Sequence, residues 1–132
     1  MEERTAACAC GALTATCRGE PARISICHCL ECKRRTGSAF SYNATYPEEQ
    51  VTVEGDFRSF RRGSDDGYWG EHQFCPNCGV SVFYRIERRP GMISIPVGGF
   101  ADPAFPDPTV SVYFERQHRW LRVHTDPPIE EL

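Results

Sequence analysis

The sequence lacks any long apolar stretch. No run of about 18 apolar residues, the length expected of a helix that crosses a bilayer, occurs among the 132 residues. The opening stretch MEERTAACAC is acidic and mixed, without the basic segment and apolar core of an export signal. We therefore expect a cytoplasmic protein that has no membrane partner.

The sequence also lacks an excess of positive charge. Its formal net charge is -3, which gives no reason to expect a nucleic-acid partner, although the stretch FRSFRRG is locally basic. It has no internal repeat or low-complexity tract, and its 40% hydrophobic and 25% charged residues are ordinary for a globular protein. The length predicts a single domain spanning residues 1–132 and leaves the oligomeric state open.

Helical periodicity is missing too. No window combines good helix formers with the i, i+3, i+4, i+7 spacing of a helix, so we expect only short helical turns. Instead, short runs rich in β-branched or aromatic residues alternate with turn residues, which is typical of strands. These runs are 12–17, 22–27, 39–46, 50–55, 80–86, 92–99 and 109–116. The pattern predicts an all-β fold, with an irregular connection over 101–109 and a weakly ordered end at 125–132.

Cysteine, by contrast, is plentiful, with eight residues. In a reducing compartment thiols serve as metal ligands or catalytic groups more often than as disulfides, and this density lies below that of a disulfide scaffold. Metal binding is therefore favoured over disulfide formation. Only Cys17 stands alone; the other thiols form the groups Cys8-Ala-Cys10, Cys27-His-Cys29-Leu-Glu-Cys32 and Cys75-Pro-Asn-Cys78.

The spacing within these groups suggests how they share metal ions. On an extended segment, two thiols separated by one residue face the same side, so a C-x-C pair can bind one ion. The C-P-N-C stretch, followed by Gly79 with its freedom to adopt positive φ, is a tight turn of the kind that brings two sulfurs to one zinc.

A zinc ribbon is one way to join the groups. It would use Cys29, Cys32, Cys75 and Cys78, but the separation from Cys32 to Cys75 far exceeds the roughly 15 to 20 residues of the usual signature. The other partition uses every clustered thiol. It gives one zinc four ligands, Cys8, Cys10, Cys75 and Cys78, and leaves Cys27, Cys29 and Cys32 as a local three-thiolate set.

Four protein ligands saturate a structural zinc, whereas three leave a position for substrate, as in catalytic zinc sites. A thiolate-rich open zinc suits a soft ligand such as a substrate thiol. In the alternative, Cys17, His28 or His72 completes a structural site. We expect His28 to face away from its cysteine neighbours, and Cys17, in an apolar run, to be a buried core thiol. A dithiol redox role for C-P-N-C is disfavoured because a strand pattern follows it rather than a helix.

Residues after the third thiol of the triplet are candidate ligand contacts. Lys33, Arg34 and Arg35 would offset the negative charge of a three-thiolate zinc and attract substrate carboxylates, or they form a solvated surface run. Gly37 and Ser38 would present backbone N–H groups or a hydroxyl to a ligand, or they form a turn before the next strand.

The ordered cysteine motifs resemble those of the glutathione-dependent formaldehyde-activating enzyme family, which also includes centromere protein V. The matching stretches are C-A-C-G at 8–11, C-H-C-L-E-C-K-R-R-T-G-S-A-F at 27–40, F-C-P-N-C-G-V-S-V at 74–82 and V-G-G-F-A-D-P-A-F at 97–105, together with the region of Trp120. The resemblance covers essentially the whole chain. It implies packed antiparallel sheets of the β-tent type and the joining of glutathione to formaldehyde as S-hydroxymethylglutathione.

The resemblance also implies roles for the thiols. Cys8, Cys10, Cys75 and Cys78 match the structural zinc ligands, and Cys27, Cys29 and Cys32 match the thiols of a second zinc at the active site. The leading hypothesis is a zinc-dependent carbon-sulfur lyase-like enzyme with two Zn²⁺ per chain, acting on a glutathione-like thiol and a small aldehyde. The alternative is a non-catalytic binding module in which both zinc ions are structural.

Overall fold

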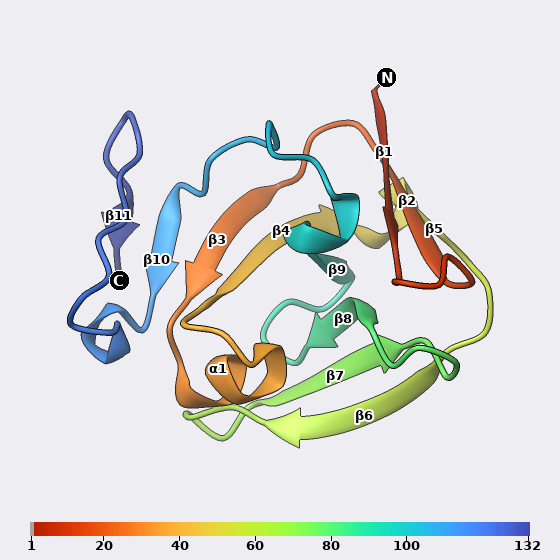
Figure 1. The fold of residues 1–132 in the computed structure, drawn as a ribbon, viewed down its shortest axis with the longest axis horizontal. Helices are drawn as coiled ribbons and strands as arrows, with labels where there is room; N and C mark the ends of the chain where they lie inside the picture. Colours follow the sequence, from red (N-terminus) through yellow and green to blue (C-terminus); the bar gives the residue numbers. More distant parts are fainter. Residues whose placement is uncertain (1) are drawn as a thin grey trace.

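A computed structural model describes residues 2–132, and the regular secondary structure of this part of the chain consists mainly of strands (Figure 1). The strands are β1 (Glu3–Ala7), β2 (Thr14–Arg18), β3 (Arg23–Cys27), β4 (Ser41–Pro47), β5 (Val51–Glu54), β6 (Arg58–Gly63), β7 (Trp69–Phe74), β8 (Ser81–Ile86), β9 (Met92–Pro96), β10 (Val110–Val112) and β11 (Glu130–Glu131). The helical elements are α1 (Leu30–Thr36) and the short 3-10 turns η1 (Glu48–Gln50), η2 (Val97–Phe100) and η3 (Phe114–Arg116). The all-β prediction is confirmed. None of the described helices is long and apolar enough to cross a membrane.

The strands form two sheets. One has three strands in the order β1-β2-β5, and the other has eight in the order β11-β10-β3-β4-β9-β8-β7-β6. Neighbours pair antiparallel except at β10, which runs parallel to both β3 and β11. The prediction of a weakly ordered carboxyl end was wrong for its last residues, because β11 pairs with β10 and the Leu132 N–H donates to the Ser111 carbonyl at 2.8 Å. The 101–109 connection is irregular, as predicted.

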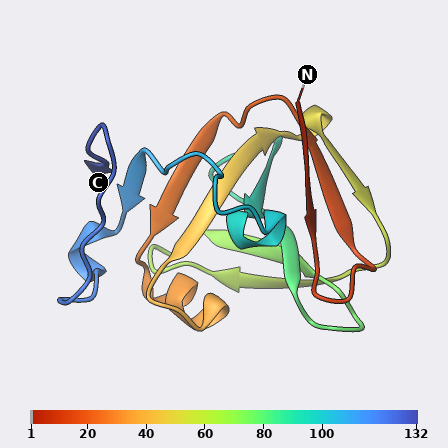
Figure 2. The same ribbon diagram turned by 45° about the horizontal axis from the view of Figure 1, so that its top comes forward.

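The large sheet curls strongly, with the small sheet packed beside it (Figures 1 and 2). The curl brings the β6–β7 hairpin, at one edge, to the start of α1, which follows β3 near the other edge. Asp65 in the hairpin turn accepts hydrogen bonds from the backbone N–H groups of Leu30 at 2.9 Å and Glu31 at 3.4 Å. These bonds fix the helix against the hairpin.

Both faces of the central strands are buried. Along β4, Ala44 and Tyr46 enter an apolar core shared with the small sheet, whose contributions include Ala15. Asn43 and Thr45 point the opposite way, because side chains alternate along a strand, and they are also buried. The neighbouring strands repeat this division. Their core residues include Ile24, Ile93 and Ile95, and their polar residues on the other face include Ser25 and Ser94.

Helix α1 is stabilised by hydrogen bonds at its two ends rather than by burial of an apolar face, since none of its residues is buried. At its start, the thiol of Cys29 acts as N-cap and accepts a hydrogen bond from the Cys32 N–H at 3.2 Å. At its end, Gly37 adopts a left-handed φ of 62° and its N–H donates to the Lys33 carbonyl. The basic residues of the last turn also complement the negative end of the helix dipole.

Gly55, directly after β5, lies against the backbone of Ala12 and allows a test of this close approach. Its φ is 103°, and a Cβ added there would lie 2.0 Å from the carbonyl oxygen of Ala12. We expect Gly55→Ala to lower the free energy of unfolding by more than about 2 kcal/mol, because strain and a backbone clash act together. Gly63→Ala is the control, since its Cβ would meet nothing within 4 Å. Urea unfolding measures both, and equal stabilities would contradict the prediction.

Candidate metal centres and adjoining cavity

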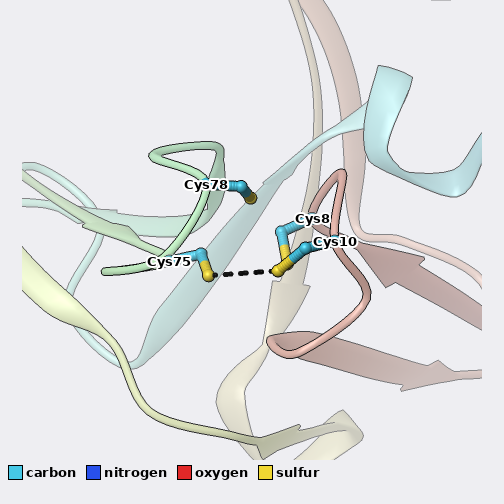
Figure 3. Close-up of side chains that lie close together, drawn as sticks. All are labelled: Cys8, Cys10, Cys75 and Cys78. Atoms are coloured by element: carbon cyan, nitrogen blue, oxygen red, sulfur yellow. Dashed lines mark hydrogen bonds between the residues drawn. The ribbon is translucent and has the colours of Figure 1, made fainter.

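Four thiols from two distant turns meet between the sheets (Figure 3). Cys8 and Cys10 come from the β1–β2 turn, and Cys75 and Cys78 from the β7–β8 turn. All four sulfurs lie within 4.8 Å of one another, and the Cys8–Cys10 and Cys10–Cys75 sulfur distances are both 3.7 Å. Tetrahedral Zn–S bonds of about 2.3 Å place sulfurs roughly 3.8 Å apart, so this donor set fits a zinc ion.

Backbone amides prepare these sulfurs for metal binding. The Leu13 N–H donates to the Cys8 sulfur at 3.3 Å and lowers the pKa of that thiol, and the Val80 N–H lowers the pKa of Cys78. Metal ligands must be thiolates, so both effects favour binding. Gly79 has the positive φ predicted for it, 80°. The Cys8–Cys10 segment is not extended as we predicted; it turns directly after β1, with the Gly11 N–H donating to the Cys8 carbonyl at 3.1 Å.

Three further thiols converge where β3 passes into α1. Cys27 ends β3, Cys29 caps α1 and Cys32 lies in its first turn, with all three sulfurs within 4.8 Å of one another. No fourth His, Cys, Asp or Glu side chain of residues 2–132 joins this group. Hydrogen bonds from the thiols of Cys27 and Cys29 lower the pKa of Cys32 to about 2, and hydrogen bonds with Cys29 and then Cys32 raise the pKa of Cys27. The donor set fits a metal ion with one position left for another ligand.

The residues considered as a fourth ligand all lie elsewhere. Cys17 is fully buried in the core between the sheets, where burial raises its thiol pKa to about 12. His28 faces away from the thiols, and its Nε2 lies 3.0 Å from the Ser111 hydroxyl. His72 stacks on the ring of Tyr84 with 4.8 Å between centroids. The three-thiol group therefore stays open on the protein side.

A cavity of about 510 Å³ adjoins the three thiols. Its floor is the polar face of the large sheet, which contributes Ser25, Asn43, Thr45 and Ser94. Its walls carry five arginines and no acidic side chain; the arginines are Arg23, Arg35, Arg62, Arg88 and Arg89. The volume lies within the range of small-molecule sites.

Of the predicted ligand contacts, Arg35 alone lines this cavity. The Lys33 ammonium donates instead to the carbonyl of Arg116, and Arg34 pairs with Glu31 on the exposed side of α1. Gly37 serves as the helix C-cap, and Ser38 is exposed beyond it. These four residues lie outside the cavity.

The sequence reasoning missed the other arginines. Arg62 on β6 donates to the Cys32 sulfur at 3.9 Å, although thirty positions separate them in the chain. One signal was available, because period-2 alternation along the predicted 22–27 strand places Arg23 on the same face as Ser25 and Cys27. Arg62, Arg88 and Arg89 carry no such local signal, since only the curl of the sheet brings them to the thiols.

Comparison with known proteins gives a consistent result. Residues 3–116 match the profile of the family described as glutathione-dependent formaldehyde-activating enzyme. A crystal structure of a Rhodobacter sphaeroides protein from a structural genomics programme aligns with a TM-score of 0.56 and 22% identity, covering 72% of this chain and 85% of that one, and so shares the fold. No curated protein matches.

The two thiol groups should respond differently to substitution. We expect chains produced with zinc to hold two ions. Cys29→Ser should lose one ion while the chain stays folded, whereas Cys78→Ser should lower the free energy of unfolding by several kcal/mol. The difference arises because only the four-thiol group, to which Cys78 belongs, joins the two sheets. Cys17→Ala is the control and should keep both ions. Elemental analysis and thermal unfolding measure these effects, and equal collapse of the Cys29 and Cys78 variants would contradict the division.

Buried His72 should make stability depend on pH. Burial, with the charges of Arg35 and Arg62, lowers its pKa to about 3, so the unfolded chain binds this proton from about pH 6.5 downward while the folded chain does not. The contribution is thus complete above about pH 6.5 and is lost as the pH falls toward 3. By pH 5.5 the loss is about 1.4 kcal/mol.

The variant His72→Phe keeps a ring against Tyr84 and should remove this contribution. The measurement is the difference in urea unfolding free energy between pH 7.5 and pH 5.5. His124→Phe, at an exposed position, is the matched control and should keep the wild-type difference. An unchanged pH dependence in His72→Phe would show that this histidine does not cause it.

Proposed function

Because the chain belongs to the glutathione-dependent formaldehyde-activating enzyme family, we propose that it is a zinc-dependent carbon-sulfur lyase-like enzyme. It joins a glutathione-type thiol to a small aldehyde at the site of Cys27, Cys29 and Cys32. One observation carries the proposal: these three thiols meet at the wall of a cavity of about 510 Å³, with no fourth protein ligand from residues 2–132.

The two thiol groups take different roles in this proposal. Zinc at the three-thiol site would supply a Lewis acid that keeps a substrate thiol deprotonated at neutral pH. Cys8, Cys10, Cys75 and Cys78 would hold a structural ion and leave it no position for substrate. Arg62, which already donates to the Cys32 sulfur, partly offsets the negative charge that collects when a substrate sulfur approaches.

The reaction itself is an addition. The substrate thiol gives up its proton, a lone pair of its sulfur forms a bond to the aldehyde carbon, and the π pair of the carbonyl moves to its oxygen. The proton lost from the thiol is balanced by one that moves to this oxygen, which gives a hemithioacetal. Hydroxyls on the cavity floor, such as those of Ser25 and Ser94, donate hydrogen bonds to the oxygen as its charge develops. The reverse reaction breaks the carbon-sulfur bond, which is the lyase direction.

The same chemistry supports a cytoplasmic location. Both thiol groups and the thiol substrate have to remain reduced, and the cytoplasm maintains thiols in that state. Oxidation of the triplet would remove the donors that hold the second zinc.

Magnetisation-exchange NMR tests the activity, because hemithioacetal formation also proceeds without a catalyst and has to be compared with that background. We expect the zinc-loaded chain to speed exchange between formaldehyde and S-hydroxymethylglutathione by at least about tenfold. Cys29→Ser should return the rate to background, since it removes one of three metal ligands. Cys17→Ala, outside both thiol groups, should keep the full rate.

Two results would contradict the proposal. Background exchange in the fully zinc-loaded chain, together with no calorimetric heat from millimolar glutathione, would favour the non-catalytic binding module. Full activity in Cys29→Ser would place the reaction away from the three thiols.

A further inference from the structure

None of the five cavity arginines forms an ion pair with an acidic side chain of residues 2–132. The six ion pairs found among residues 2–132 use other arginines, namely Arg4, Arg34, Arg61, Arg85 and Arg116. The acidic residues of the nearby β6–β7 turn are also engaged: Asp65 binds Arg116 and two amides of α1, and Asp66 accepts from the Tyr113 hydroxyl. The cavity is therefore strongly cationic within a chain whose formal net charge is -3.

Two of these arginines are explained by the thiol site. Three thiolates around a divalent ion carry a formal charge of about −1, and a substrate thiolate makes it about −2. Arg62 reaches the Cys32 sulfur, and Arg35 follows Cys32 on α1, with its guanidinium over the Tyr84 ring at 5.2 Å. These two charges balance the occupied site. Each also has a buried Nε without a hydrogen-bond partner in the described chain.

The other three arginines have no such explanation. Arg23 lies on β3, Arg88 and Arg89 lie in the β8–β9 turn, and the remaining side chains of the lining are neutral apart from the thiols. Burial and the positive charge of Arg89 lower the pKa of Arg23, and the smaller opposing effects of Cys27, Glu130 and Tyr84 do not reverse this. Unpaired like charges in a partly buried cavity are unfavourable, and anionic groups of a ligand would relieve the repulsion.

The floor of the cavity adds an unused acceptor. Asn43 is only 4% exposed, and its Nδ2 donates to the Ser41 hydroxyl at 3.0 Å. Its Oδ1 is buried and has no partner in the described chain. Because a buried carbonyl oxygen without a partner is costly, this atom fits a ligand N–H such as that of a peptide bond.

We propose that Arg23, Arg88 and Arg89 determine which thiol substrate the cavity accepts: these arginines bind at least two carboxylates of the substrate, and an α-ammonium group adds nothing to its binding. Glutathione meets the first requirement, whereas its ammonium group finds no acidic side chain in the lining. This inference rests on the proposed function, because the ligand that it concerns is the thiol substrate of the same cavity.

Calorimetric titration of the metal-loaded chain with S-methylglutathione and two derivatives tests the selection. N-acetylation removes the ammonium charge and should leave the affinity unchanged or raise it. Esterification of the glycine carboxylate removes an anion and should weaken binding about tenfold, since a charge-assisted hydrogen bond is lost. Weaker binding after N-acetylation, equal binding of the ester, or no binding of any of these compounds at millimolar concentration would overturn the proposal.

Variants assign the effect to particular arginines. We expect R23Q and R89Q each to weaken S-methylglutathione binding about tenfold and to shrink the difference between acid and ester. R58Q is the matched control, because Arg58 is exposed on β6 outside the cavity. Since Arg23 is partly buried, R88Q at an exposed position of the same cavity provides a second test that leaves folding unchanged. Wild-type affinity in all three cavity variants would overturn the assignment.

Failure of this inference differs from failure of the proposed function. S-methylglutathione has no free thiol, so its binding reports anion recognition alone. If glutathione binds no more tightly than its S-methyl form while both depend on the arginines, thiol coordination at Cys27, Cys29 and Cys32 is wrong and charge selection stands. If glutathione binds more tightly and neither compound depends on the arginines, charge selection is wrong and thiol coordination stands.

Discussion

The architecture depends on the burial of both faces of the central strands of the large sheet. Side chains alternate along β3, β4 and β9, so one set, exemplified by Ala44 and Tyr46, packs against the small sheet, and the other, exemplified by Asn43 and Thr45, forms the floor of a polar cavity. A shift of one residue in strand pairing would exchange these sets and place polar groups in the core. The strand register that stabilises the fold is therefore also the register that shapes the site.

The two thiol groups differ in how they are assembled. Cys27, Cys29 and Cys32 form a local group, created where β3 ends and α1 begins, and the thiol of Cys29 is itself the helix cap. The four-thiol group is not local, because it joins the β1–β2 turn of the small sheet to the β7–β8 turn of the large one. A local group can lose a ligand without separating the sheets, which is consistent with a division between a reactive centre and a structural one.

Much of this structure could be predicted from the sequence. Strands that bury an apolar face, such as β3, β4 and β9, are recognisable because apolar and polar residues alternate along them. Strands β6 and β7 were not predicted, because their sequences, RSFRRG and WGEHQF, contain many polar residues and lack an alternating apolar pattern. Their strand conformation depends on hydrogen bonding to each other and, for β7, to β8. Helix α1 was missed because it buries no residue and is specified by its ends. Spacing within the cysteine motifs found both thiol groups. It could not find Arg62 on β6 or Arg88 and Arg89 in the β8–β9 turn, because only the curl of the sheet brings them to the thiols.

The four-thiol group also bears on the order in which the chain assembles. Cys75 and Cys78 share one turn and Cys8 and Cys10 share another, so a metal ion could engage either pair while the rest of the chain is still unfolded. Cys10 lies 65 positions from Cys75, and closing a loop of that length has an entropic cost that only docking of the two sheets repays. The remaining two ligands therefore reach the ion late. A complete set of four metal-binding thiolates would then mark a chain that has finished folding, and the exchange rate of a bound metal ion would report how often the two sheets come apart.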